Sequence, residues 1–102
     1  LPVEKLNRIL EKVVAYENRS KMHLYILSEA ITGNESLKDK LQKSYKKWRG
    51  ILKEGIEQLN FENYIDSNAL SYVIVALMDG LAIQKLIGPE EIPFENISGL
   101  LI

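Results

Sequence analysis

Residues 66–89, DSNALSYVIVALMDGLAIQKLIGP, decide the fold of this chain. The stretch opens on Asp66, Ser67 and Asn68, residue types that cap helix N-termini. It closes on Gly88 and Pro89, for which we expect a left-handed stop followed by a residue that cannot continue a helix. Between these signals the apolar residues occupy every side of a 3.6-residue wheel. We therefore predict one helix buried nearly all round, which a single bundle layer covers only in part, and we expect a partner subunit to cover the remainder.

Length and composition limit the classes of protein that this sequence can encode. A chain of 102 residues with 46% hydrophobic and 26% charged residues is typical of one globular domain, so we expect a single domain over residues 1–102. The absence of cysteine excludes disulfides, thiolate metal sites and a cysteine nucleophile, and fits an intracellular protein. A net charge of −1 provides no general attraction to nucleic acid or anionic lipid.

The sequence predicts a soluble, cytoplasmic protein. Residues 1–10 alternate charge with apolar residues at helical spacing, which is unlike a secretion signal. Asp79, Gln84 and Lys85 interrupt residues 66–87 well short of the ~20 uninterrupted apolar residues that a bilayer requires. The abrupt start and the apolar end of the sequence indicate a fragment of a longer protein.

Four further helices are expected around the 66–87 helix. Residues 3–18 show the apolar spacing of an amphipathic surface helix. Residues 20–32 predict a central, buried helix that ends at Gly33, with a strand as the competing interpretation of 24–27. Residues 34–59 predict a long helix capped by Asn34. A short fifth helix begins near Pro93, and its apolar face comprises Phe94, Ile97, Leu100 and Leu101.

The predicted class is therefore all-α, an antiparallel bundle of about five helices. In the long helix, Gly50 and Gly55 each cost about 1 kcal/mol relative to alanine. We interpret them as marking a bend or a close approach by another backbone. The loop at 60–65 carries Phe61 and Tyr64 to the start of the 66–87 helix.

Several segments together resemble the C-terminal regulatory domain of TetR-family transcriptional repressors. They are residues 37–60 (LKDKLQKSYKKWRGILKEGIEQLN), Phe61, Asp66 and above all residues 76–81 (ALMDGL), followed by Gln84 and Pro89. The resemblance implies an effector-binding and dimerisation domain that follows an N-terminal helix-turn-helix. It further implies an intersubunit four-helix bundle, made by the last two helices and their counterparts. Because no helix-turn-helix signature occurs within the chain, we expect these residues alone not to read DNA.

Methionine and aromatic side chains suit an apolar pocket with a few hydroxyl and indole donors, although plain core packing explains them equally well. The predicted effector pocket lies between the helices at 20–32, 34–59 and 66–87. Its candidate ligand-binding residues are Met22, Tyr25, Tyr45, Trp48, Tyr72 and Met78.

A symmetric homodimer is predicted mainly on the 66–87 helix, because exposing its apolar side chains would forgo several kcal/mol. The candidate interface residues are Leu70, Val73, Leu77, Gly80, Leu81, Phe94, Ile97 and Leu101.

His23 and Asp79 are the two polar residues that stand out in apolar surroundings. As the only histidine, His23 lacks the partners of a metal site or a catalytic relay, and packing or surface exposure is favoured over a place on a pocket wall. Asp79 would be costly to bury unpaired, so it pairs with a basic residue or a hydroxyl, or faces a polar cavity. Gly80 beside it allows another helix to approach. We predict no catalytic residues, no metal site and no cofactor.

The densest basic run of the sequence suits phosphate contacts. It comprises Lys38, Lys40, Lys43, Lys46, Lys47 and Arg49. A solvated helix face is the favoured interpretation, because these residues alternate with an apolar stripe.

The leading functional hypothesis is a ligand-sensing and dimerising repressor domain. One rival is a small helical enzyme using Glu29 or Asp79, for which no nucleophile, base and metal set is visible. The other rival is a helical protein-interaction module whose core is filled by side chains. A closed cavity in the core distinguishes the leading hypothesis from the second rival.

Overall fold

The computed structural model describes residues 2–15, 17–58, 66–88 and 91–101, and these residues form five helices without a strand. The helices are α1 (Pro2–Ala15), α2 (Glu17–Ile31), α3 (Glu35–Gln58), α4 (Ser67–Ile87) and α5 (Phe94–Leu101). The all-α prediction is confirmed, and residues 24–27 are helical because they lie within α2. The predicted loop residues Phe61 and Tyr64 lie outside the described residues.

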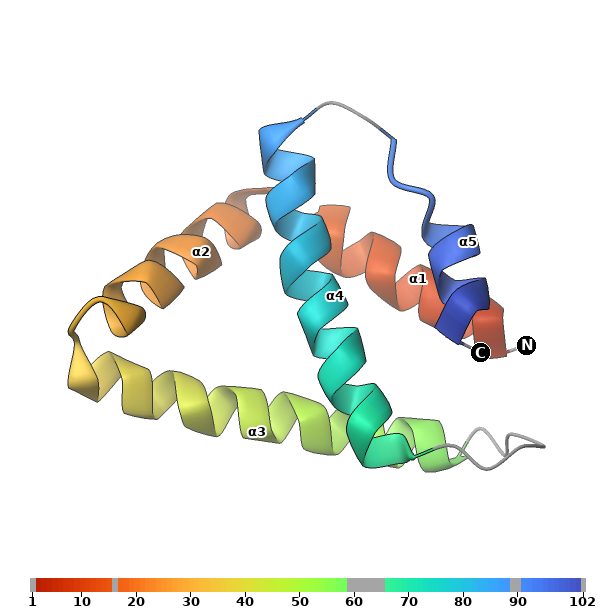
Figure 1. Ribbon diagram of the computed structural model, residues 1–102, viewed down its shortest axis with the longest axis horizontal. Coiled ribbons are helices and arrows are strands. Elements are labelled where there is room, and N and C mark those ends of the chain that lie inside the picture. Colours follow the sequence, from red (N-terminus) through yellow and green to blue (C-terminus); the bar gives the residue numbers. More distant parts are fainter. Residues whose placement is uncertain (1, 16, 59–65, 89–90, 102) are drawn as a thin grey trace.

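Helix α4 runs through the middle of the molecule and separates two groups of helices (Figure 1). Helix α2 and the N-terminal part of α3 lie on one side of α4, α1 and α5 lie on the other, and the C-terminal part of α3 crosses α4 near its start. The Cα atoms extend over 44 × 32 × 15 Å, so the chain is flat. Since one helix with its side chains is about 10–12 Å across, a molecule this thin cannot cover α4 on all sides.

Side-chain caps begin two of the helices as predicted. The Asn34 Oδ1 atom accepts a hydrogen bond from the Leu37 amide at 3.0 Å, and Asp66 Oδ1 accepts one from the Ala69 amide at 3.0 Å. Each cap satisfies an amide that the first helical turn leaves without an intrahelical partner.

The two glycine stops differ. Gly33 follows α2 with a φ of +147°, a conformation that favours glycine, as the sequence predicts. The left-handed conformation predicted for Gly88 is wrong, because this residue is extended, with φ −128° and ψ 150°. Its amide still donates to the Gln84 carbonyl at 3.0 Å, so α4 ends without a left-handed residue. Pro89 lies outside the described residues.

The core lies between α1, α4 and the C-terminal part of α3. Its buried members are Leu6, Leu10, Ile56, Leu70 and Ile74. Helix α5 packs on α1, and its half-buried side chains also pack against this core; they are Phe94, Ile97 and Leu101.

Two expectations about burial are wrong. Helix α4 is not buried all round within one chain, because Val73, Ile83 and Ile87 are exposed while Ile74 and Leu81 are buried. Helix α2 is not central: it lies at the edge of the flat molecule, and among its described side chains only Ser20 and Ala30 are buried. In both cases the reason is that one layer of helices covers one face of its neighbour.

The predicted close approach at Gly50 and Gly55 is also wrong. Within the described part of the chain, no atom of another element lies within 4 Å of the position that a Cβ would occupy at either residue. Helix α3 continues through both positions, which are exposed.

Among the described residues, α4 is the one helix that is long and apolar enough to cross a membrane by length and composition, despite Asp79 and Lys85. The core helix of a soluble protein passes the same test.

Candidate functional site

Helices α2, α3 and α4 line a half-open cavity of about 490 Å³. Most of its wall is apolar, and Ser20, His23 and Asp79 supply polar atoms. The lining residues are Ser20, His23, Leu24, Trp48, Ile51, Leu52, Val75, Met78, Asp79 and Ala82.

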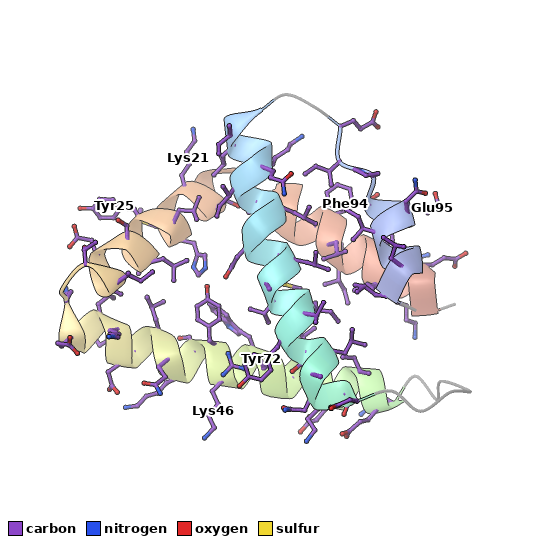
Figure 2. All side chains as sticks on the ribbon, viewed as in Figure 1. Lys21, Tyr25, Lys46, Tyr72, Phe94 and Glu95 are labelled. Carbon is purple, nitrogen blue, oxygen red and sulfur yellow. The ribbon has the colours of Figure 1, made fainter. Side chains whose placement is uncertain are left out.

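Helical spacing explains why these residues share one wall. Each helix contributes positions that are three or four residues apart, which fall on one face. Helix α2 contributes residues 20, 23 and 24, α3 contributes 48, 51 and 52, and α4 contributes 75, 78, 79 and 82. Figure 2 shows side chains of all three helices extending into the space between the ribbons.

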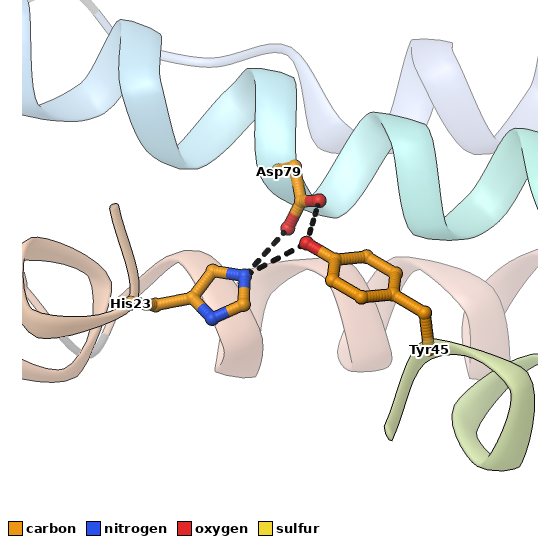
Figure 3. A network of polar contacts seen from close by, with 3 residues as sticks. All are labelled: His23, Tyr45 and Asp79. Carbon is orange, nitrogen blue, oxygen red and sulfur yellow. Dashed lines mark hydrogen bonds and ion pairs between the residues drawn. The ribbon is translucent and has the colours of Figure 1, made fainter. Parts of the chain in front are cut away.

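One polar cluster joins all three helices at the cavity (Figure 3). The Tyr45 hydroxyl of α3 donates to Asp79 Oδ2 of α4 at 2.5 Å. The His23 Nε2 atom of α2 lies 2.9 Å from Tyr45 Oη and 3.3 Å from Asp79 Oδ1. Because the single hydroxyl proton of Tyr45 is committed to Asp79, the hydrogen bond between His23 and Tyr45 requires a proton on Nε2. This network gives Asp79 the hydroxyl partner that its sequence position predicts.

The surroundings of Tyr45 keep its hydroxyl protonated. Burial raises the pKa of Tyr45 well above its usual range, and the hydrogen bond to Asp79 and the negative charge of that carboxylate raise it further. The phenol therefore acts as a hydrogen-bond donor that holds α3 against α4.

Three rings pack together beside this cluster. Tyr45 and Trp48 form an edge-to-face pair with centroids 5.0 Å apart. The His23 ring lies 5.9 Å from Tyr45 and 5.8 Å from Trp48. These separations are typical of favourable aromatic contacts. The three rings therefore stabilise one another at the end of the cavity where the polar atoms lie.

The predicted pocket residues divide into two groups. Trp48 and Met78 line the cavity, and Tyr45 adjoins it through its bonds to His23 and Asp79. The other three candidates lie outside the wall: Met22 is 61% exposed, Tyr25 65% and Tyr72 54%.

These three side chains point to other faces of their helices. Figure 2 shows Tyr25 on the side of α2 that faces away from α3. Tyr72 packs under the Arg49 guanidinium, whose central carbon lies 4.2 Å from the ring centroid.

Six of the eight predicted interface residues pack inside a single chain. Leu70 and Leu81 are buried, and the half-buried side chains against the core are Leu77, Phe94, Ile97 and Leu101. Val73 is exposed, and Gly80 has no atom of another element within 4 Å of its Cβ position. Among the eight candidates, Val73 is therefore the exposed one, and Gly80 is half-buried with open space at its Cβ position.

Sequence reasoning missed several lining residues and misjudged another. The missed residues have side chains without distinctive chemistry, and they are Ser20, Leu24, Ile51 and Val75. Only their helical spacing relative to Trp48 and Asp79 could have indicated that they line the cavity. His23 lies on the wall, although packing or surface exposure was the favoured interpretation of a lone histidine.

Neither a metal nor phosphate has an evident site in the described part of the chain. No group of three or more His, Cys, Asp or Glu residues there could hold a metal ion. Lys46 points away from the molecule in Figure 2, and Lys43 pairs with Asp39 of its own helix at 3.2 Å. These placements support a solvated basic face on α3.

Comparison with protein families identifies the chain. The family of C-terminal domains of BetI-type transcriptional repressors matches residues 2–101, which span all five helices. No curated protein and no solved structure matched the chain. The family match confirms the resemblance to TetR-family regulators and the all-α class. The chain therefore belongs to the BetI-type C-terminal domains of the TetR family of transcriptional regulators.

Proposed function

We propose that this domain senses a small apolar or aromatic effector and forms a homodimer, so that effector binding modulates DNA binding by the repressor. Regulators of the TetR family generally dimerise and bind DNA and small effectors. They are in general non-enzymatic, and they are typically soluble and cytoplasmic. The observation that carries the proposal is the cavity between α2, α3 and α4.

The size and wall of the cavity suit such a ligand. Its volume of about 490 Å³ lies within the range of small-molecule sites, roughly 300–1,000 Å³. Apolar side chains such as Leu52, Val75 and Met78 form most of the wall, with polar atoms gathered at His23 and Asp79. A mostly apolar wall with a few convergent polar groups is typical of ligand pockets. The cavity is half open and not the closed one that would exclude a filled core, so its volume supports the proposal and ligand binding decides against the protein-interaction hypothesis.

The exposed stripe of α4 supports the homodimer. Five small or apolar residues recur along it at intervals of three and four, and only Gly80 among them is half-buried. They are Val73, Ala76, Gly80, Ile83 and Ile87. A seam at this spacing suits packing against a second helix, and the small residues at its centre permit a close crossing.

Helix α4 couples the two roles. Val75, Met78, Asp79 and Ala82 of α4 line the cavity, whereas the stripe lies on another face of the same helix. An effector that binds one position of α4 better than another shifts the population of dimer geometries. The affinity of the intact repressor for DNA changes with it, because the separation of the two DNA-reading heads depends on the dimer geometry.

The test uses uncharged aromatic compounds such as butylbenzene. Trp48 is the only tryptophan, so its fluorescence reports on the cavity wall. We expect a saturable fluorescence change and a raised melting temperature. Val75→Phe, which fills the cavity, should abolish both effects, whereas Ile31→Phe at an exposed position of α2 should preserve them. If no compound of a broad uncharged panel binds, the protein-interaction hypothesis replaces this one.

A further inference from the structure

Asp79 sets the charge of the cavity wall. Among the described lining residues it is the one acidic side chain, and neither lysine nor arginine lines the wall. The basic group nearest to it on the wall is His23, which offsets the carboxylate only when its ring is protonated. A carboxylate next to an apolar wall acts more strongly on a ligand than it would in bulk water, because the effective dielectric constant is lower. The wall therefore favours a cationic ligand over an acid.

The carboxylate has acceptor capacity left for a ligand. A carboxylate has about four lone-pair sites. The Tyr45 hydroxyl and His23 Nε2 occupy two directions, at 2.5 and 3.3 Å. The Asp79 side chain is 30% exposed, and it lines the cavity. A ligand in the cavity can thus reach its oxygens.

We infer that the effector is a lipophilic amine whose protonated nitrogen donates an N–H hydrogen bond to Asp79. This inference rests on the proposed function, since it assigns a chemical class of ligand to the same cavity. The amine nitrogen lies at the polar end, and the apolar body packs along Trp48, Leu52 and Met78.

The two existing partners of Asp79 differ in how readily a ligand replaces them. The Tyr45 contact is short, whereas the His23 contact at 3.3 Å is long for a charge-assisted hydrogen bond. An amine that approaches Oδ1 therefore competes with the long His23 contact and not with the Tyr45 bond, which holds Oδ2. Because His23 belongs to α2 and Tyr45 to α3, such competition affects a contact of α2 and preserves the link between α3 and α4.

The nitrogen must carry a hydrogen. A quaternary ammonium cannot donate, and its methyl groups hold the positive charge away from the carboxylate oxygens. Hydrogen bonding to Asp79 is consequently the interaction that selects the head group.

A matched ligand series tests the inference on the chain. The compounds are 4-phenylbutylamine, its N,N,N-trimethyl derivative, 4-phenylbutanol and 4-phenylbutyrate, with affinities from calorimetry and Trp48 fluorescence. We expect the primary amine to bind roughly tenfold more tightly than the alcohol and the trimethyl compound, as a charge-assisted hydrogen bond implies. The butyrate should bind most weakly of the four.

Two variants locate the preference. Asp79→Asn should bring the affinities for amine and alcohol together, whereas Asp39→Asn, at an exposed carboxylate of α3, should leave the tenfold difference unchanged. If Asp79→Asn fails to fold by circular dichroism, the ranking of the four compounds on the unmodified chain decides alone.

Equal affinity for the amine and the alcohol, or a preference for the trimethyl compound or the butyrate, overturns the inference and leaves the proposed function intact. Failure of all four compounds overturns the inference as well. The proposed function falls only if the uncharged panel also fails to bind.

Discussion

The Tyr45 hydroxyl lies 2.5 Å from Asp79 Oδ2, which joins α3 to α4 at the wall of the cavity. The two residues are 34 positions apart in the chain, so this bond forms only when the helices pack. The bond provides a hydrogen-bond donor to Asp79, which is the one acidic side chain among the described lining residues. It also holds α4, the helix that carries the exposed stripe, in place. The first two predictions test it.

Removing the Tyr45 hydroxyl should destabilise the domain. Tyr45→Phe leaves the half-buried Asp79 carboxylate with the longer His23 contact, and we expect unfolding to become easier by about 1–3 kcal/mol. Urea denaturation followed by circular dichroism measures the change. The control Tyr25→Phe removes a hydroxyl from an exposed ring and should have little effect. Equal losses in the two variants would contradict a structural role for the Tyr45 bond.

Alkaline pH should remove part of the stability. The pKa of Tyr45 is raised above its unfolded value of roughly 10. Above pH ~10 the unfolded chain therefore releases a proton that the folded chain retains, and stability falls as pH rises. Below that pH the contribution is fully present. Urea midpoints from pH 9 to 11.5 should decline more steeply for the unmodified chain than for Tyr45→Phe. Parallel profiles would show that other groups cause the decline.

The core prediction concerns Leu10, which is fully buried among α1, α3 and α4 side chains. Leu10→Ala should cost roughly 2–5 kcal/mol, because it removes buried methyl groups and leaves a cavity. Its neighbour Ile9 is 39% exposed, so Ile9→Ala should cost clearly less. Thermal and urea denaturation of the two variants provide the comparison. A larger loss at Ile9 would mean that α1 presents another face to the core.

The dimer prediction separates association from folding. Ile83→Glu places a charge on the exposed stripe of α4, so we expect a folded monomer by light scattering and an unchanged helical content. Ile31→Glu, at an exposed position of α2, should remain dimeric. By contrast, Leu81→Glu should unfold the chain itself, since Leu81 is buried within one subunit. A monomeric unmodified chain at micromolar concentration would exclude the proposed interface.

Sequence alone determined the helices and several of their ends. The Asn34 and Asp66 caps and the Gly33 stop are recognisable because each depends on groups within a few residues along the chain. The TetR resemblance was also visible, because apolar spacing and the ALMDGL segment are properties of linear sequence. Gly88 was misjudged because the extended and left-handed conformations are both open to glycine, and sequence does not choose between them.

Only the tertiary structure decided which faces of the helices meet. Leu70, Leu77, Val73 and Ile83 are all apolar, so the sequence gives no reason to bury one before another. In the structure Leu70 and Leu77 pack into the core, whereas Val73 and Ile83 are exposed. Likewise, His23 and Asp79 are visible as unusual residues, but their meeting through Tyr45 spans separations of 22 and 34 residues. Helix formation depends on hydrogen bonds between near neighbours. The cavity depends on which residues on the apolar faces of α2, α3 and α4 contact one another and which are left to line open space. That division is a property of the packed molecule, and no single segment contains it.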